Sequence, residues 1–385
     1  MPVQYRKFGK LSWEASVLGF GIMRLPVIDG DRTQIDETEA TRMLRYAIDQ
    51  GVNYLDSGYG YHGGNSEKFL GRALQDGYRQ RVRLATKLPC WTVEKAEDFD
   101  RFLDEQSERL QTEHIEFYLL HALGKKHWPR LRDMGVIPWA EKAMADGRIG
   151  HLGFSFHDEY ELFQQIIDDY DGWTMCQIQY NYMDVEQQAG RRGLEYAAEK
   201  GLAVVVMEPI RGGRLSNKVP PSVQAIWDSA PLQRSPAEWA LQWVWSQPEV
   251  TVALSGMSTM QHVQENLASA ERSAPNLLTE GEEALVARVR VAYEDLCPIP
   301  CTDCKYCLPC PSGVNIPGVF EVYNDLGMFG DEARARMVYG WLEEDERANL
   351  CIECGECLEK CPQNIGIPDW LAKVHKALCQ EEAPA

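Results

Sequence analysis

The sequence predicts an α/β protein, in which a (β/α)8 barrel is followed by a small, mainly α-helical domain. Short apolar runs alternate eight times with segments in which apolar residues recur at helical spacing. Such alternation is typical of a closed parallel barrel. Nine of the twelve cysteines fall between Cys297 and Cys361, which marks a second region of different composition. We therefore expect one domain at residues 1–295 and another at 296–385.

The elements of the first domain follow one another along the chain. A hairpin at 3–16 is expected before the barrel. The apolar runs expected to form strands are 18–23, 52–56, 82–87, 117–121, 149–155, 176–181, 202–207 and 250–256. The segments expected to form the following helices are 37–50, 66–75, 98–110, 139–146, 159–168, 193–199, 237–245 and 260–271. A last amphipathic helix at 280–296 leads to the boundary, which Pro298 and Pro300 mark.

The composition is that of an ordinary globular protein and disfavours two function classes. Hydrophobic residues make up 44% and charged residues 25% of the chain. The apolar runs are far shorter than the roughly 20 residues that span a membrane, and the N-terminus lacks the apolar core of a signal peptide. The net charge of −19 opposes nucleic-acid binding, which requires a basic surface. We expect a cytoplasmic protein that binds neither membranes nor nucleic acid.

The negative charge is concentrated in the final segment. Residues 296–385 contain 7 Lys and Arg against 15 Asp and Glu, a net charge of −8, which leaves −11 for the first 295 residues. The final segment is therefore more than twice as acidic per residue. Either this charge belongs to an ordinary solvated surface, or it attracts a basic partner.

Polar side chains stand at the ends of three consecutive expected strands. Asp56 ends the second strand and Tyr61 follows five residues later, while Lys87 and His121 end the third and fourth strands. In a barrel of this class the carboxyl ends of the strands form the rim where catalytic groups lie. Each residue alone has an ordinary interpretation as a cap, a packed ring or a solvated charge. Their repeated placement predicts a catalytic cluster.

These four residues resemble, in order and spacing, the Asp, Tyr, Lys and His tetrad of the aldo-keto reductase family. The resemblance covers roughly residues 1–295, from YRKFGKLSWEASVLGFGIMRL to GMSTMQHVQENL. It implies an enzyme that reduces a carbonyl or oxidises an alcohol with NADP(H) or NAD(H). Tyr61 is then the general acid, and Lys87, held by Asp56, lowers the pKa of Tyr61. His121 orients the substrate oxygen.

The same resemblance implies where the nicotinamide cofactor binds. The residues at matching positions are Ser155 and Gln177 for the carboxamide, Met207 for the nicotinamide ring, Gly212 and Gly213 with either Arg211 or Arg214 for the pyrophosphate, and Gly256, Glu265 and Asn266 towards the adenosine. Phe156 stands where the family has Asn, and Met207 where it often has Tyr. Gly256 and His262 stand where basic residues often read the 2′-phosphate, so the choice between NADPH and NADH stays open.

A pocket for a small-molecule substrate is expected beside the tetrad. Its candidate residues are Met23, Tyr59, Trp91, Leu123, His127 and Trp128. These side chains can equally serve to pack the loops.

The cysteines of the final segment form two motifs. One reads CTDCKYCLPCP from Cys301 and the other CIECGECLEKCP from Cys351. Runs of this kind, closed by Cys-Pro, ligate iron–sulfur clusters, although paired C-x2-C also makes zinc sites. We expect one [4Fe-4S] cluster on Cys301, Cys304, Cys307 and Cys361, and a second on Cys351, Cys354, Cys357 and Cys310. The first motif has C-x2-C before its Pro where C-x3-C is usual, so Cys297 is either a substitute ligand or a spectator.

The spacer at 317–350 has helical periodicity. In this it resembles the helical two-cluster ferredoxin domains of respiratory iron–sulfur subunits. Three interpretations of function follow. The clusters relay single electrons between the barrel and a redox partner, such as a ferredoxin-like protein. Alternatively, they are structural or sense oxygen in an ordinary carbonyl reductase, or the chain is a non-catalytic electron-transfer subunit.

Overall fold

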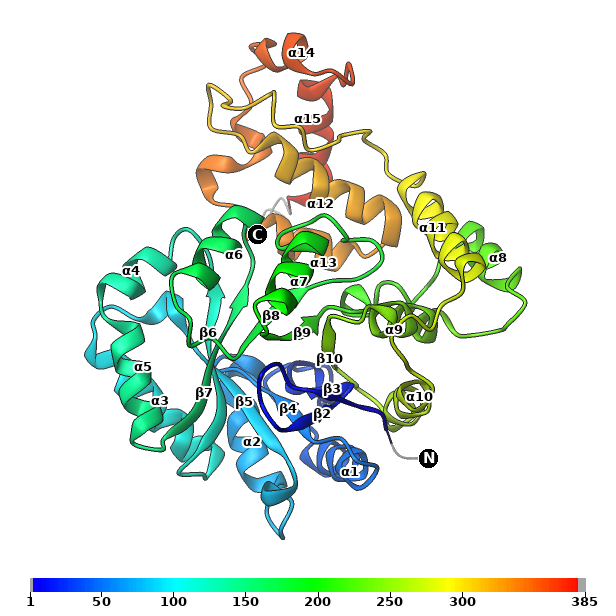
Figure 1. The fold of residues 1–385 in the computed structure, drawn as a ribbon. Coiled ribbons are helices and arrows are strands. Elements are labelled where there is room, and N and C mark those ends of the chain that lie inside the picture. The colour runs from blue at the N-terminus through cyan, green and yellow to red at the C-terminus, as the bar shows by residue number, and fades with distance from the viewer. Residues whose placement is uncertain (1–2, 380–385) are drawn as a thin grey trace. The chain divides into compact units, whose positions relative to one another are not determined.

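The computed structural model describes residues 3–379 (Figure 1). Within these residues the chain divides into two compact units. One comprises 3–216 and 234–283, and the other comprises 217–233 and 284–379. The expected division at 295 and 296 stays a prediction.

The first unit contains the expected barrel. Within the described residues, eight parallel strands close into a ring in the order β10-β3-β4-β5-β6-β7-β8-β9. Their bounds are β3 (Leu18–Gly21), β4 (Tyr54–Asp56), β5 (Arg83–Leu88), β6 (Ile115–Leu123), β7 (Ile149–Phe156), β8 (Met175–Gln179), β9 (Ala203–Met207) and β10 (Val250–Ser255). The predicted fold class is therefore confirmed. All carboxyl ends of the strands meet at one rim because every pairing is parallel.

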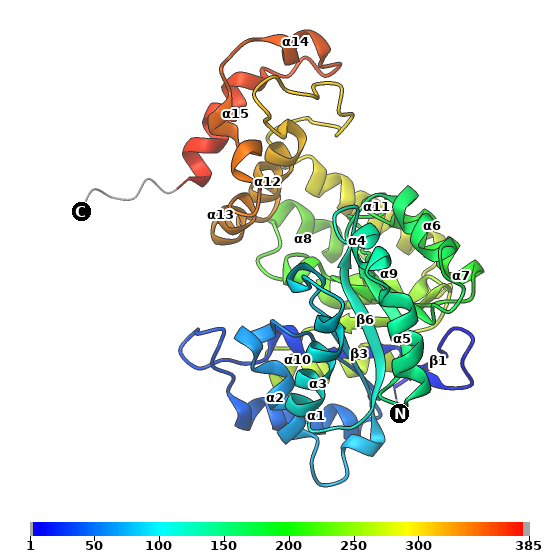
Figure 2. The same cartoon turned by 90° about the vertical axis from the view of Figure 1, so that its left-hand side faces the viewer.

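Helices surround the ring of strands (Figures 1 and 2). They are α1 (Glu37–Asp49), α2 (Ser66–Ala73), α3 (Glu97–Leu110), α4 (Trp128–Asp133), α5 (Val136–Ala145), α6 (Tyr160–Asp168), α7 (Gly190–Glu199), α9 (Pro236–Ser246) and α10 (Met260–Glu271). Each strand begins and ends within two residues of the expected bounds; the expected strand at 18–23, for example, ends at Gly21, and η1 (Ile22–Arg24) follows. Helices α4 and α8 (Pro221–Asp228) were not predicted, because they lie in segments expected to be loops.

The interior of the barrel is a packed core. The expected hairpin forms from β1 (Tyr5–Lys7) and β2 (Glu14–Ser16), which pair antiparallel. Phe8, which follows β1, belongs to the buried cluster inside the barrel and stacks near Phe117 with 4.6 Å between ring centroids. The strands are buried on both faces, which explains their continuous apolar sequence.

The second unit contains the cysteine-rich segment, here called the tail (residues 296–379). Its helices are α12 (Ile316–Phe329), α13 (Glu332–Tyr339), α14 (Glu356–Lys360) and α15 (Ile367–Leu378), preceded by α11 (Glu280–Glu294) and interrupted by η6 (Glu344–Glu346) and η7 (Ala348–Leu350). Three of them, α12, α13 and α15, pack against one another. The helical spacer is thus confirmed, whereas α15 was not predicted.

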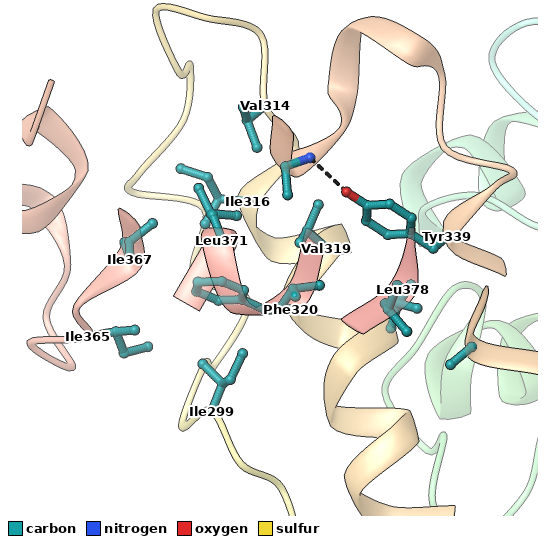
Figure 3. Close-up of a cluster of buried hydrophobic side chains, with 14 residues drawn as sticks. Ile299, Val314, Ile316, Val319, Phe320, Tyr339, Ile365, Ile367, Leu371 and Leu378 are labelled. Carbon is teal, nitrogen blue, oxygen red and sulfur yellow. Dashed lines mark hydrogen bonds between the residues drawn. The ribbon is translucent and has the colours of Figure 1, made fainter. Parts of the chain in front are cut away.

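An apolar core holds the tail together (Figure 3). Phe320, Ile316 and Leu371 lie at its centre, and the Tyr339 hydroxyl lies 3.1 Å from the amide nitrogen of Ala348, from which it accepts a hydrogen bond. The buried Asn324 side chain bonds both the amide and the carbonyl of Ile299, at 2.9 and 2.8 Å. These bonds fix the chain just before the first cysteine motif, because they satisfy backbone groups that are out of reach of water.

None of the helices described in residues 3–379 is long and apolar enough to cross a membrane.

Candidate functional site

The four tetrad residues meet at the carboxyl rim of the barrel. Asp56 ends β4, and Lys87 and His121 lie near the ends of the neighbouring strands β5 and β6. Tyr61 opens the short helix η2 (Tyr61–Gly64), which follows β4. The strands bring together residues that stand up to 65 positions apart in the sequence, which is the distance from Asp56 to His121.

Lys87 is the centre of this group. Its ammonium lies 2.6 Å from Asp56 Oδ1 and 3.3 Å from the Tyr61 hydroxyl, and it also donates to the carbonyl of Ser57. The Lys87 side chain is fully buried and that of Asp56 is 5% exposed. A buried ammonium requires such partners, since an unpaired charge is very costly away from water.

A glycine allows the Tyr61 ring to reach this position. A Cβ atom on Gly58 would lie 2.9 Å from the Tyr61 ring. The ring therefore packs directly on backbone, where any other side chain would push it away from Lys87.

Burial and charge act in opposite directions on these groups. Burial acts to lower the pKa of Lys87, but Asp56 and Tyr61 outweigh it, so the pKa of Lys87 is raised above its ordinary value. Burial raises the pKa of Asp56, although Lys87 and Gln177 act to lower it. Lys87 therefore remains an ammonium at neutral pH.

The expected lowering of the pKa of Tyr61 is wrong in its net direction. Lys87 does act to lower this pKa, but burial acts more strongly and raises it. Sequence reasoning counted the charge and could not count the desolvation, which depends on the surrounding fold. Tyr61 is consequently a phenol, and hence a proton donor, throughout the neutral range.

His121 lies beside Tyr61 in a largely apolar setting. Its ring centroid is 6.0 Å from that of Tyr61 and 4.9 Å from that of Trp91. Burial, with a further contribution from the charge of Lys87, lowers the pKa of His121 well below the usual histidine value. The imidazole is therefore neutral near pH 7. Its Nδ1 atom is buried without a hydrogen-bond partner among residues 3–379.

The candidate carboxamide contacts lie on β7 and β8. The amide nitrogen of Gln177 donates to Asp56 Oδ2 at 2.9 Å, and Ser155 Oγ accepts from the amide of Ala122 at 2.7 Å. Ser155 retains its own hydroxyl donor and Gln177 its carbonyl acceptor, which is the pair of groups that a carboxamide needs. Phe156 instead packs on Phe163, with 5.1 Å between ring centroids, and offers no polar group. Two of the family's three contacts thus have the chemistry that the cofactor requires.

The candidate phosphate contacts follow β9 and β10. Gly212 and Gly213 lie in η5 (Arg211–Gly213) and have φ of +66° and +94°, a conformation that favours glycine. The Arg211 guanidinium is buried and lies 3.2 Å from Asp184 Oδ2. The charge of Arg211 is thus already paired with a buried carboxylate. A phosphate-binding role for this loop therefore rests on the backbone around Gly212 and Gly213.

Sequence reasoning missed a cation in the same region. Arg24, just after β3, forms an ion pair with Glu208 at 3.1 Å, and about a third of its side chain is exposed. Cβ atoms on Gly212 and Gly256 would lie 2.8 and 2.9 Å from this arginine. Arg24 therefore lies between the two loops expected to bind phosphate. The sequence did contain a signal for this cation, because Arg24 is a basic residue directly after the first expected strand.

The remaining cofactor candidates lie near the end of the barrel sequence. Asn266 is buried on α10 and donates to Ser255 Oγ at 2.9 Å, while the exposed Glu265 accepts from Gln261 at 2.7 Å. Met207 ends β9 and is half-buried.

Tyr59 and His127 are partly buried, and the other four expected pocket residues divide into two groups. Met23 and Trp91 are about half exposed, at 54% and 49%. Trp128 and Leu123 are buried, and the Trp128 indole donates to Asp169 at 2.8 Å. Met23 and Trp91 are therefore available to a substrate, whereas Trp128 and Leu123 pack the loop.

The tail brings the predicted cysteine ligands together around two cavities in its described part. One cavity is lined by all four residues of the first predicted set, namely Cys301, Cys304, Cys307 and Cys361. The other is lined by all four of the second set, Cys310, Cys351, Cys354 and Cys357, and also by Cys307. Cys297 lines neither cavity.

This donor set suits iron–sulfur clusters. Across residues 3–379, no three His, Cys, Asp or Glu side chains lie close enough together to hold a single metal ion. The four cysteines of each predicted set instead line one cavity together, and each set takes one cysteine from the other motif. Four thiolates per cluster is the usual ligation of a [4Fe-4S] cluster.

The other cysteines are less suited to binding metal. Cys90 and Cys176 are buried in the barrel, and burial raises the pKa of the Cys90 thiol to about 12. Only the thiolate is a good metal ligand.

Fold and rim together define a reductase-type (β/α)8 barrel, here joined to a cysteine-rich tail. The profile of the aldo/keto reductase family matches residues 17–276, more than half of the chain. The chain thus belongs to the aldo/keto reductase family and is an oxidoreductase. A 4Fe-4S dicluster domain matches residues 300–365. The resemblance inferred from the tetrad and the cysteine motifs is confirmed.

Characterised relatives share the barrel. L-galactose dehydrogenase of Arabidopsis thaliana is 24% identical over 285 residues, covering 69% of this chain and 88% of the relative. Methylglyoxal reductase YeaE of Escherichia coli is 28% identical over 237 residues, covering 59% and 78%. The structure of aldo-keto reductase AKR11C1 from Bacillus halodurans, in its holo form, superposes with a TM-score of 0.62 at 26% identity, covering 74% of this chain and 96% of that one.

The cysteine arrangement predicts the metal content. Anaerobically purified protein should be brown and contain about eight iron and eight sulfide per chain, because two four-iron clusters need eight thiolates. Replacing one ligand of either set, as in Cys301→Ser or Cys354→Ser, should remove roughly half of the iron. Cys176→Ser, outside both cavities, is the matched control and should retain all of it. A colourless protein with stoichiometric zinc would contradict the assignment.

Proposed function

We propose that the barrel reduces the carbonyl of a small molecule, or oxidises the corresponding alcohol, and that the tail exchanges single electrons with the barrel or with a redox partner. The observation that carries the first part is the position of Lys87 between Asp56 and Tyr61, at 2.6 and 3.3 Å. The names of the relatives, a galactose dehydrogenase and a methylglyoxal reductase, support a small oxygenated substrate.

Each tetrad residue has a distinct task in this proposal. Tyr61 donates a proton from its hydroxyl to the substrate oxygen, on which negative charge develops during reduction. Lys87 stabilises the phenolate that remains, since an ammonium at 3.3 Å favours the charged form. Asp56 and the Ser57 carbonyl hold the ammonium in place. His121, which is neutral, donates a hydrogen bond that orients the substrate oxygen.

A nicotinamide, when bound, supplies the hydride. Ser155 and Gln177 would hold its carboxamide, Met207 would cover its ring, and the backbone around Gly212 and Gly213 would meet its pyrophosphate, with Arg24 nearby. Asn266 and Glu265 would lie towards the adenosine, with Gly256 between. NADPH and NADH are both candidates for the cofactor. Gly256 and His262 stand where the family often has the basic residues that read the 2′-phosphate of NADPH.

Iron–sulfur clusters, when bound, pass one electron at a time. The predicted ligand sets are the cysteines that line the two cavities, and the acidic composition of the tail supports an external carrier of electrons. A second candidate, in which the clusters are structural, draws support from the way six of the eight cysteines pack against the apolar core of the tail. A cluster in that position can stabilise the fold.

The first prediction concerns the proton donor. Tyr61→Phe removes the hydroxyl and keeps the ring, so turnover should fall by at least ~10² while the affinity for nicotinamide stays near that of the wild type. Steady-state kinetics and fluorescence titration with NADPH and NADH measure the two quantities. Tyr78→Phe, which removes a hydroxyl bonded to Asp49, is the control and should retain activity. Undiminished turnover in Tyr61→Phe would exclude Tyr61 as the acid.

The second prediction concerns pH. Reduction needs protonated Tyr61, whose pKa is raised, so the single-turnover rate should be flat from about pH 6 to 9 and fall only above the usual tyrosine pKa of about 10. Since the pKa of His121 is lowered, His121 should produce no step near its usual value of about 6.5. Lys87→Met removes the charge that favours the phenolate and should slow the reaction at every pH. A wild-type rate that declines between pH 6 and 9 would refute this assignment of the acid.

The third prediction separates the relay from the structural role. When the anaerobic protein is mixed with NADPH, NADH or a reducing alcohol in a stopped-flow instrument, the cluster absorbance should bleach on the timescale of turnover. Tyr61→Phe should slow the bleaching by a substrate alcohol, because the same proton transfer is involved in reverse. Clusters that keep their redox state throughout turnover would be structural.

A further inference from the structure

The two cysteine motifs differ in their exposed apolar side chains. The first motif has one aromatic side chain, Tyr306, which is 66% exposed, and the second has two aliphatic ones, Ile352 and Leu358, which are 70% and 43% exposed. Ile352 also lines the second cavity, and Cys354 beside it is exposed. Large apolar side chains at such exposure cost free energy in water and are typical of contact surfaces. We give the name Ile352 surface to the exposed side chains of Ile352, Glu353, Leu358 and Glu359, which belong to the loop before α14 and to α14 itself (Figure 1).

The charge of the two motifs differs as well. In the first motif the opposite charges of Asp303 and Lys305 cancel, and Lys305 Nζ lies 3.8 Å from Asp303 Oδ2. In the second motif, Lys360 pairs with Glu356 at 3.5 Å. Glu353 and Glu359 are exposed and form no ion pair within the described part of the chain. The second motif therefore keeps two unbalanced negative charges beside its apolar residues.

A second acidic segment adjoins the same cavity. The turn η6, with Glu344, Asp345 and Glu346, contacts the segment at 313–315, where the amide of Asn315 donates to the carbonyl of Glu346 at 2.9 Å. That segment directly follows Pro311 and Ser312, which line the second cavity. Acidic residues thus occur next to segments that line this cavity in two parts of the tail.

We propose that the Ile352 surface is the docking site of a one-electron carrier protein with a basic rim around its redox group. This inference rests on the proposed electron exchange and adds where it occurs: at the ligand set of Cys310, Cys351, Cys354 and Cys357. Ile352 and Leu358 form the apolar centre of the contact and the acidic residues form its rim, the usual anatomy of a protein interface. The partner is basic because opposite charge steers encounter.

The exchange is balanced as a simple electron transfer. In each encounter one electron passes from the tail to the carrier, or from the carrier to the tail. No bond is formed or broken and no proton is transferred. Two encounters account for the two electrons of one carbonyl or alcohol.

The experiment uses the anaerobic full-length holoprotein, reduced chemically with dithionite and freed of excess reductant. The probe is a basic c-type cytochrome in its oxidised form, and its lysine-acetylated form serves as the probe with the charge removed. For Glu353→Lys/Glu359→Lys we expect the second-order rate constant of cytochrome reduction at low salt to fall about tenfold. The wild-type rate should fall with added salt and with acetylation, because exposed charges beyond ~10 Å are screened at 0.1 M.

Matched variants separate the surface from overall charge. Glu113→Lys/Glu199→Lys makes the same change in net charge at exposed positions of the barrel and should leave the rate near that of the wild type. Ile352→Ser should weaken binding of redox-inactive, zinc-substituted cytochrome several-fold, whereas Val291→Ser, at a similarly exposed aliphatic side chain (53%), should not. Glu353 has φ of +56°, and lysine, like glutamate, is unbranched at Cβ, so the substitution adds no branching at this backbone conformation. Iron content and the electron paramagnetic resonance spectrum of each variant establish that both clusters are intact.

Equal loss in both double variants, or none in either, overturns the proposal. So does self-association of the chain through this surface, seen in sedimentation as a dimer that Ile352→Ser abolishes. Because the electrons come from dithionite, the result does not depend on activity in the barrel. Clusters that are inert towards NADPH, NADH and substrate, but reduce cytochrome through the Ile352 surface, would refute the proposed function and leave the docking site standing.

Discussion

The buried ion pair between Lys87 and Asp56 is the interaction on which the active-site rim depends. Both side chains lie almost entirely out of water, so removing one partner leaves an uncompensated charge, at a cost of about 3–5 kcal/mol. The pair also links two neighbouring strands, and Gln177 adds a third from the far side of the ring by its bond to Asp56. The ammonium is thereby held where it can act on Tyr61. Stability and chemistry require the same geometry here.

The sequence was sufficient to predict the barrel, and to predict that Asp56, Tyr61, Lys87 and His121 meet at its rim. Apolar runs of strand length, each followed by a helical pattern, define the ring, and a closed parallel ring forces strand ends to one rim. What it could not supply was the balance of forces at that rim. The net rise in the pKa of Tyr61 depends on burial by residues from several strands, and the bond from Gln177 to Asp56 joins residues 121 positions apart. Local patterns carry no information on either.

The cofactor side illustrates the same limit. A family match alone makes Arg211 a natural phosphate ligand, yet the fold buries it against Asp184 and leaves Arg24 between the glycine loops. In the tail the outcome differs, because the repeated C-x2-C spacing is a local signal. This spacing, with a Cys-Pro at the end of each motif, predicts which cysteines share a cluster. Each of the two cavities is lined by three cysteines of one motif and by the last cysteine of the other, as expected of such motifs.

The reductase barrel and the cysteine-rich tail differ in the number of electrons that they transfer at a time. Carbonyl reduction consumes two electrons and needs a proton at the right moment, whereas a redox protein of the iron–sulfur type delivers electrons singly. Under the proposed function, a tail with two ligand sets would hold as many electrons as one turnover needs, and the Ile352 surface would be where those electrons enter or leave. The rim, where Tyr61 stays protonated, would then supply the proton donor that the tail lacks.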